Sequence, residues 1–131
     1  MNFRDRRSGF APTILSLLRV ITALLYMEHA TMKLFGFPPS QFQPPLLSLF
    51  GAAGVIEIIG STLLVLGLFT RPVALILSGE MAIAYFAFHL PQSFFPLLNQ
   101  GEGAILFCFI FLYLVFAGPG PISIDRARGA E

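Results

Sequence analysis

The residues of this sequence with the most chemical potential are two histidines, a lysine, an asparagine and a glutamate beside long apolar stretches. They are His29, Lys33, His89, Asn99 and Glu102. Two histidines and a carboxylate could ligate a metal ion, two histidines could bind haem axially, and the same donors could hold a quinone head group. The sequence has no HxxxH or ExxH pair. We therefore expect polar caps of helix ends or a small-molecule pocket here, and neither metal nor haem.

Three further ionisable residues, Arg19, Glu57 and Glu80, stand inside the apolar stretches. An ionisable side chain deep in a bilayer costs about 2.5–3.5 kcal/mol on insertion scales, so it needs a partner. We predict an intramembrane ion pair between Arg19 and Glu57, which either fixes helix packing or forms part of a polar site or proton path. Glu80 is out of phase with His89. We therefore expect either that the Glu80 carboxyl group is protonated or that a partner subunit or second copy contacts it.

Four apolar segments must position these residues. They cover about 11–34, 46–69, 72–90 and 100–118. A helix of about 20 residues crosses the roughly 30 Å hydrocarbon core of a bilayer. The chain is 56% hydrophobic and only 11% charged, against about 25% charged in soluble domains, and its mean hydropathy is +0.79. The sequence predicts an all-α fold, an integral membrane four-helix bundle in which residues 1–131 form one domain.

Basic residues predict the orientation of this bundle. Six of them fall at the N-terminus, in the second connection and in the tail, namely Arg4, Arg6, Arg7, Arg71, Arg126 and Arg128. Four crossings place all three regions on one side, with Lys33 alone on the other. Lysine and arginine accumulate in cytoplasmic loops. We therefore expect a multi-pass protein of the bacterial inner (plasma) membrane with both termini in the cytoplasm.

Small residues indicate which helix faces meet. Glu57 lies on a stripe with Gly54, Gly60, Ser61 and Gly67. A second stripe follows Arg19 and contains Ser16, Thr22, Ala23, Tyr26 and Lys33. Small residues let helices approach closely in lipid, so we expect these two stripes to form the contact surfaces.

The composition also excludes several functions. A net charge of +1 without a basic face gives no basis for nucleic-acid binding. Cys108 is the only cysteine, which excludes an internal disulfide, a CxxC redox pair and a CxxCH haem attachment. We expect Cys108 to be a small packing residue.

Three segments resemble those of the DoxX family of small bacterial membrane proteins. LLRVITALLYMEHATMKLFGFP (17–38) is similar to its opening helix, with an early Arg at Arg19 and a His-small-x-x-Lys-Leu-Phe-Gly ending that begins at His29. GVIEIIGSTLLVLGLFTRPVA (54–74) resembles its Glu-containing second helix and Gly-Leu-x-Thr-Arg turn. NQGEGAILFCFIFLYLVFAGPGPISID (99–125) resembles its Asn-x-Gly-Glu start and Gly-Pro-Gly-x-x-Ser-x-Asp end.

The resemblance implies a four-helix inner-membrane protein. The family name derives from a subunit linked to thiosulfate:quinone oxidation, and relatives are discussed as membrane partners of redox enzymes. A shared fold does not by itself assign a reaction.

We therefore expect a non-catalytic membrane subunit or scaffold, linked to redox or respiratory processes and packing through Glu80 and the glycine-rich faces. Helical rise places His29, Lys33, His89, Asn99 and Glu102 toward the outer end of the bundle, and we call them the outer polar residues. One alternative is a quinone-binding oxidoreductase subunit that uses these outer polar residues. Another is a small proton-coupled transporter that uses Arg19, Glu57 and Glu80, although the sequence has no internal inverted repeat. The expected partners are the lipid bilayer and either a redox enzyme or a second copy of the chain.

Overall fold

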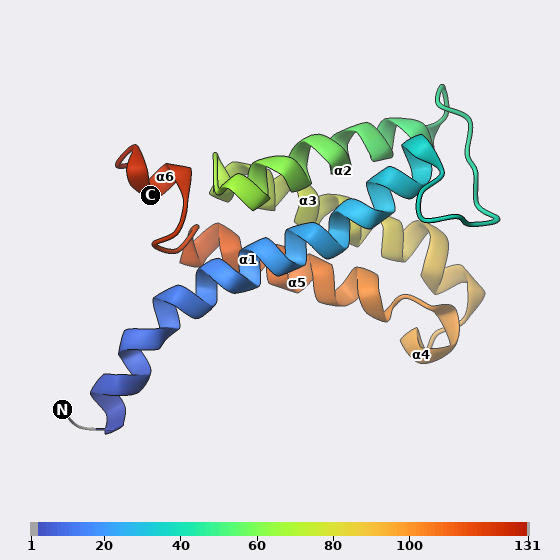
Figure 1. Ribbon diagram of the computed structural model, residues 1–131. Coiled ribbons are helices and arrows are strands. Elements are labelled where there is room, and N and C mark those ends of the chain that lie inside the picture. The colour runs from blue at the N-terminus through green and yellow to red at the C-terminus, as the bar shows by residue number, and fades with distance from the viewer. Residues whose placement is uncertain (1–2, 131) are drawn as a thin grey trace.

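The computed structural model describes residues 3–130, with side chains from Ser8 onward, and these residues form helices and loops without a strand (Figure 1). The long helices are α1 (Phe3–Phe35), α2 (Leu49–Leu66), α3 (Thr70–Ala84) and α5 (Glu102–Ala117). A π-helical turn η1 (Tyr85–His89) and a 3-10 turn η2 (Leu90–Gln92) extend α3. Two short helices, α4 (Pro96–Asn99) and α6 (Ile124–Ala127), complete the order. The predicted all-α fold is confirmed.

Three of these helices are long and apolar enough to cross a membrane. Their candidate spans are Ser8–Phe35, Leu49–Leu66 and Thr70–Gln92. The fourth predicted crossing, 100–118, corresponds to the shorter apolar helix α5. Sixteen residues rise about 24 Å, less than a hydrocarbon core of about 30 Å. Helix α5 is therefore apolar but shorter than the three candidate spans.

Local capping explains where two helices begin. Ser48 is the N-cap of α2 and its hydroxyl oxygen accepts from the Gly51 N–H at 3.2 Å, so the helix starts three residues later than predicted. Asn99 and Gln100 do not open α5, because Gln100 takes a left-handed conformation with φ +59° at the end of α4. The first helix, in contrast, begins well before the predicted residue 11.

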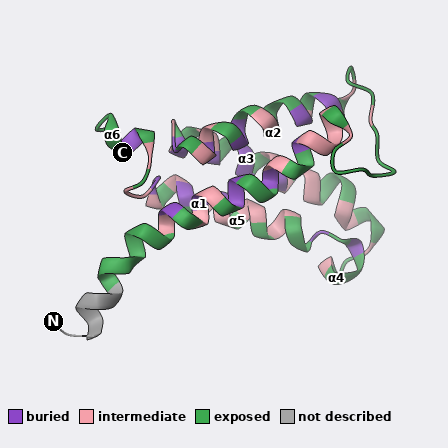
Figure 2. Cartoon of the chain, in the orientation of Figure 1, coloured by how far each residue is buried: buried purple, intermediate pink, exposed green. Residues whose placement is uncertain are grey.

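The long helices pack as two pairs, α1 with α2 and α3 with α5. The pairs meet over a core of small and aromatic side chains that includes Ala23, Tyr26, Leu64, Leu77 and Phe111. Both predicted contact stripes are buried along α1 and α2, apart from Lys33, which is partly buried. Large apolar residues remain exposed on the outer surface of every long helix (Figure 2), as expected where lipid rather than water is the solvent.

Successive long helices run in opposite directions (Figure 1). One end of the molecule holds the α2–α3 turn and residues 118–130, and we call it the tail end. The other end holds the 36–48 connection and the 93–101 connection, and we call it the loop end. Each buried charged residue lies nearer to one of these two ends.

Candidate functional site

Lys33 and Glu57 form a buried ion pair between α1 and α2. The Lys33 ammonium lies 2.7 Å from Oε1 of Glu57. The Glu57 side chain is 1% exposed and that of Lys33 is 14% exposed. The Cβ that would replace hydrogen on Gly54 lies 3.2 Å from Cβ of Lys33, so the small residue at this position lets α1 approach α2 closely.

The predicted ion pair between Arg19 and Glu57 is therefore wrong. Arg19 Nε donates to the main-chain oxygen of Leu64 at 2.8 Å, which places Arg19 at the C-terminal end of α2. Glu57 precedes Leu64 by seven residues, or about 10 Å of helical rise. The delayed start of α2 places Glu57 nearer the loop end, within reach of Lys33.

Arg19 instead holds the C-terminal tail against α1 and α2. Its guanidinium also donates to the carbonyl oxygens of Pro119 and Ile122. The hydroxyl oxygen of Ser16 accepts from the Ile122 N–H at 3.1 Å. Main-chain acceptors satisfy this buried charge, because helix C-termini and irregular segments present carbonyl oxygens that no helix uses.

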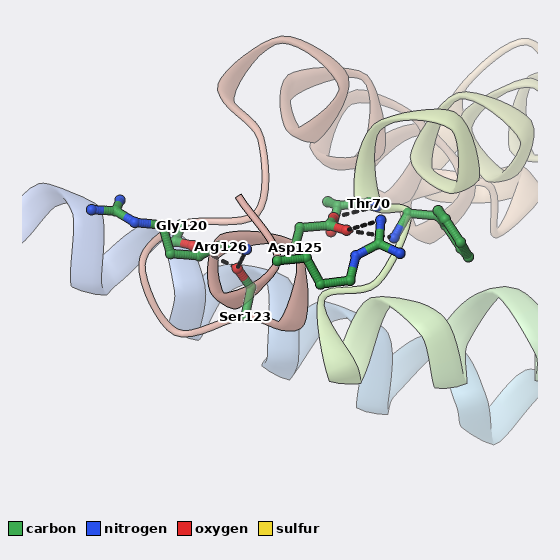
Figure 3. A network of polar contacts seen from close by, with 7 residues as sticks. Thr70, Gly120, Ser123, Asp125 and Arg126 are labelled. Atoms are coloured by element: carbon green, nitrogen blue, oxygen red, sulfur yellow. Dashed lines mark hydrogen bonds and ion pairs between the residues drawn. The ribbon is translucent and has the colours of Figure 1, made fainter. Parts of the chain in front are cut away.

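Asp125 fixes the tail to the start of α3. Its two carboxylate oxygens accept from the N–H groups of Phe69 and Thr70, each at 2.9 Å (Figure 3). Burial opposes ionisation of Asp125, but these two bonds and the charge of Arg128 outweigh it and lower the pKa of the carboxyl group below its usual value. Asp125 thus supplies the cap that the Phe69 side chain cannot provide.

Glu80 has a partner within the chain. The Tyr26 hydroxyl donates to Oε2 of Glu80 at 3.0 Å, and the Glu80 and Glu57 carboxyl groups lie within hydrogen-bonding reach of each other. We expected a second chain to cover Glu80 if it were not protonated. Within the chain, Tyr26 and Glu57 contact it, and a contact of Glu80 with a second chain stays a prediction.

The two carboxyl groups each leave one oxygen unsatisfied. Oε2 of Glu57 and Oε1 of Glu80 are buried, and no described residue donates to them. Buried polar atoms without partners are rare in folded proteins. A proton held between the two groups would satisfy both oxygens, as would a donor from a bound molecule.

A cavity of about 260 Å³ opens beside this pair, and we call it the carboxyl cavity. Lys33, Glu57 and Glu80 line it together with apolar residues of α2, α3 and η1. Ile56 and Ile83 line it as well and are 46% and 69% exposed. The cavity therefore opens onto the apolar outer surface of the molecule.

His89 and Asn99 meet at the loop end, where they organise the connection between α3 and α5. His89 Nδ1 lies 3.0 Å from the Asn99 carbonyl oxygen. The fully buried Asn99 amide donates to the Ser93 carbonyl oxygen at 2.8 Å and accepts from the Gly101 N–H at 2.8 Å. These contacts are those of a structural cap.

The other members of the predicted outer site lie apart from this cap. His29 is exposed and packs its ring against Tyr26 and Phe107, Lys33 pairs with Glu57, and Glu102 is exposed at the start of α5. The contacts of the five residues do not join them into one site. Within the described part of the chain, no group of three or more His, Cys, Asp or Glu could hold a metal ion.

Sequence reasoning missed the roles of Tyr26 and Asp125. Tyr26 was placed on the Arg19 stripe, but the partner of its hydroxyl group depends on how α1 packs against α3. Asp125 had a detectable signal. Thr70 begins a helix that has no Ser, Thr, Asp or Asn before it, so a cap from elsewhere was needed.

Comparisons with known proteins show which family the chain resembles. A sequence model of the DoxX family matches residues 14–90, a segment that contains Lys33, Glu57 and Glu80. An uncharacterized protein of Haemophilus influenzae is 45% identical over 127 residues, covering 89% of this chain and 92% of the relative. No solved structure matches the chain. With its apolar helices and this family match, the chain is a membrane protein that belongs to the DoxX family.

Proposed function

We propose that this protein binds the head group of a quinone in the carboxyl cavity and serves as a membrane subunit of a redox enzyme. The observation that carries the proposal is the pair of unsatisfied buried oxygens, Oε2 of Glu57 and Oε1 of Glu80, beside a cavity that opens onto the apolar surface. Membrane-soluble ligands with polar heads need this combination of apolar access and buried hydrogen-bonding groups.

The donors and acceptors of the site match the two redox forms of a quinone. Lys33 uses one of its three N–H groups on Glu57, which leaves donors for a quinone carbonyl oxygen. The unsatisfied carboxyl oxygens can accept from the hydroxyl groups of a quinol. A cavity of about 260 Å³ lies just below the roughly 300–1,000 Å³ of typical ligand pockets. It suits a single ring, with the apolar tail lying along the lipid-facing surface.

Quinone retention tests this proposal. The purified protein would be reconstituted in phosphatidylcholine nanodiscs with decyl-ubiquinone or, in a parallel sample, with its quinol, and the ligand that co-purifies would be quantified against empty nanodiscs. We expect stoichiometric retention above the lipid background. Glu80→Gln keeps the shape of the side chain but replaces one acceptor oxygen with a donor, so it should lower retention of the quinol form most.

Glu102→Gln is the matched control, because Glu102 is exposed and does not line the carboxyl cavity. It should retain quinone as the natural protein does. Retention equal to that of empty nanodiscs would overturn the proposal. A loss in Glu102→Gln with no loss in Glu80→Gln would place the ligand at the outer polar residues instead.

For the topology, we propose four crossings of the inner membrane with both termini in the cytoplasm, supported by the distribution of Lys and Arg. A green fluorescent protein fused to the C-terminus should fluoresce, whereas a phosphatase fused there should be inactive. An active phosphatase fusion would contradict this orientation.

Affinity purification from mild detergent tests the subunit role. It should recover a redox enzyme, and repeated recovery of the chain alone would count against this role.

A further inference from the structure

A second cavity, of about 460 Å³, lies at the tail end, and none of its lining residues lines the carboxyl cavity. Its lining comes from α1, the start of α3, the end of α5 and the tail. We call it the arginine cavity, because two arginines and no acidic residue are among the described residues that line it. Six of its lining residues carry the argument, namely Leu15, Arg71, Tyr113, Ala117, Gly120 and Arg126.

Arg71 presents a guanidinium group to this cavity that the protein satisfies only in part. Its Nη1 donates to the carbonyl oxygens of Val115 and Phe116, each at 2.7 Å, so the group is fixed against the end of α5. Nε and Nη2 have no acceptor among residues 8–130. A guanidinium held in this way offers donors in a fixed plane, which is the geometry that phosphate oxygens accept.

Arg126 supplies the second positive charge on the cavity wall. The hydroxyl oxygen of Ser123 accepts from the Arg126 N–H at 3.1 Å and caps α6 (Figure 3). The Ser123 hydroxyl also donates to the Gly120 carbonyl oxygen at 2.9 Å. The backbone that carries Arg126 is therefore fixed by local hydrogen bonds beside the cavity.

The rest of the cavity wall is apolar and continues onto the outer surface of the helices. Leu15 and Ala117 line it, and Tyr113 lines it while remaining 56% exposed. Tyrosine is enriched where the hydrocarbon core meets the head groups. The cavity thus combines two cations, an interfacial aromatic residue and an apolar flank at the end of the membrane-spanning helices.

We propose that the arginine cavity binds the phosphate group of an anionic phospholipid, with the acyl chains running along α1 and α5. Phosphate is the shared chemistry of a lipid head group and of free phosphate, and the apolar flank favours the lipid. Basic pockets between helices near a membrane surface bind anionic head groups in this way. The proposal rests on the chain lying in a membrane and is independent of quinone binding.

Native mass spectrometry of the delipidated protein in a neutral detergent tests this site. The protein would be titrated separately with palmitoyl-oleoyl phosphatidylglycerol and with palmitoyl-oleoyl phosphatidylcholine, and bound lipids counted. We expect the anionic lipid to bind about tenfold more tightly, and Arg126→Gln to weaken it about fivefold, the scale of one basic residue near a surface. Arg71→Gln should weaken it further, with circular dichroism checking that this variant is folded.

Arg128→Gln is the matched control. It removes the same charge two residues further on, but Arg128 lies against Phe69 and Asp125 and does not line the arginine cavity. It should keep the preference for the anionic lipid. Equal binding of the two lipids, or equal losses in Arg126→Gln and Arg128→Gln, would overturn the proposal. Displacement of the lipid by millimolar inorganic phosphate would show that the cavity takes free phosphate instead.

Discussion

Lys33 donates to Glu57 across the α1–α2 contact at 2.7 Å, and the carboxylate is almost completely buried. The same carboxyl group lies within hydrogen-bonding reach of Glu80, which accepts from Tyr26. One lysine, one tyrosine and two carboxyl groups from three helices therefore form a single polar cluster. The stability of the helix packing and the proposed ligand site depend on the same four side chains.

Removing one partner of the Lys33–Glu57 pair should destabilise the protein strongly. Lys33→Met keeps the length of the side chain but leaves the Glu57 carboxylate buried without its cation, which costs about 3–5 kcal/mol where buried pairs are broken. Lys33→Met/Glu57→Gln removes both charges and should recover part of that loss. The free energy of unfolding would be measured by circular dichroism in dodecyl maltoside with increasing sodium dodecyl sulfate. If the double variant loses as much free energy of unfolding as Lys33→Met and Glu57→Gln lose together, the result counts against the pair.

Arg19 and Glu57 should behave as independent residues. Arg19→Met removes donors to Leu64, Pro119 and Ile122 and should release the tail, while Glu57→Gln acts on the polar cluster. The losses of unfolding free energy from substitutions at sites about 10 Å apart without shared partners usually add within about 0.3–0.5 kcal/mol. We therefore expect the double variant Arg19→Met/Glu57→Gln to lose the sum of the two single losses in the same unfolding assay. A coupling free energy well above that range would instead indicate a direct pair between Arg19 and Glu57.

The four apolar segments could be predicted because hydropathy over about 20 residues depends on composition rather than on packing. Burial of both small-residue stripes was also predictable, since helical spacing alone places residues on a face. The partner of Arg19 was not predictable, because its acceptors are main-chain oxygens whose positions depend on where α2 ends and how the tail folds back. Helical rise places Lys33 among the outer polar residues, on the side opposite the six arginines, whereas the late start of α2 brings Glu57 opposite to it.

Acid should weaken the attachment of the tail through Asp125. The pKa of Asp125 is lower in the folded chain than its usual value, so its carboxylate contributes stability above the usual carboxyl pKa, and that contribution is lost as pH falls through the folded pKa. Unfolding of the natural protein and of Asp125→Asn would be compared from pH 7 downward. We expect the difference between them to be largest near neutral pH and to close below about pH 4.

Glu102→Gln serves as a control for that titration, since Glu102 is exposed at the start of α5. Its difference from the natural protein should stay small across the same pH range. Hydrogen exchange gives an independent measurement, because the Phe69 and Thr70 amides donate to Asp125. These two amides should exchange faster in Asp125→Asn at neutral pH, and unchanged exchange would contradict the capping role.

At Gly67 the α2–α3 turn lies close to both Arg19 and the tail. It has φ +67°, and a Cβ added there would lie 2.5 Å from Cβ of Ser123 and 3.0 Å from Cζ of Arg19. Gly67→Ala should therefore lower the free energy of unfolding by more than about 1 kcal/mol, from backbone strain and displacement of the tail.

Gly79→Ala is the matched control, because Gly79 lies inside α3 and a Cβ there meets nothing within 4 Å. That variant should be stabilised by about 0.5–1 kcal/mol, the usual gain from replacing a mid-helix glycine. Equal effects of the two substitutions would show that the tail does not pack closely on the end of α2.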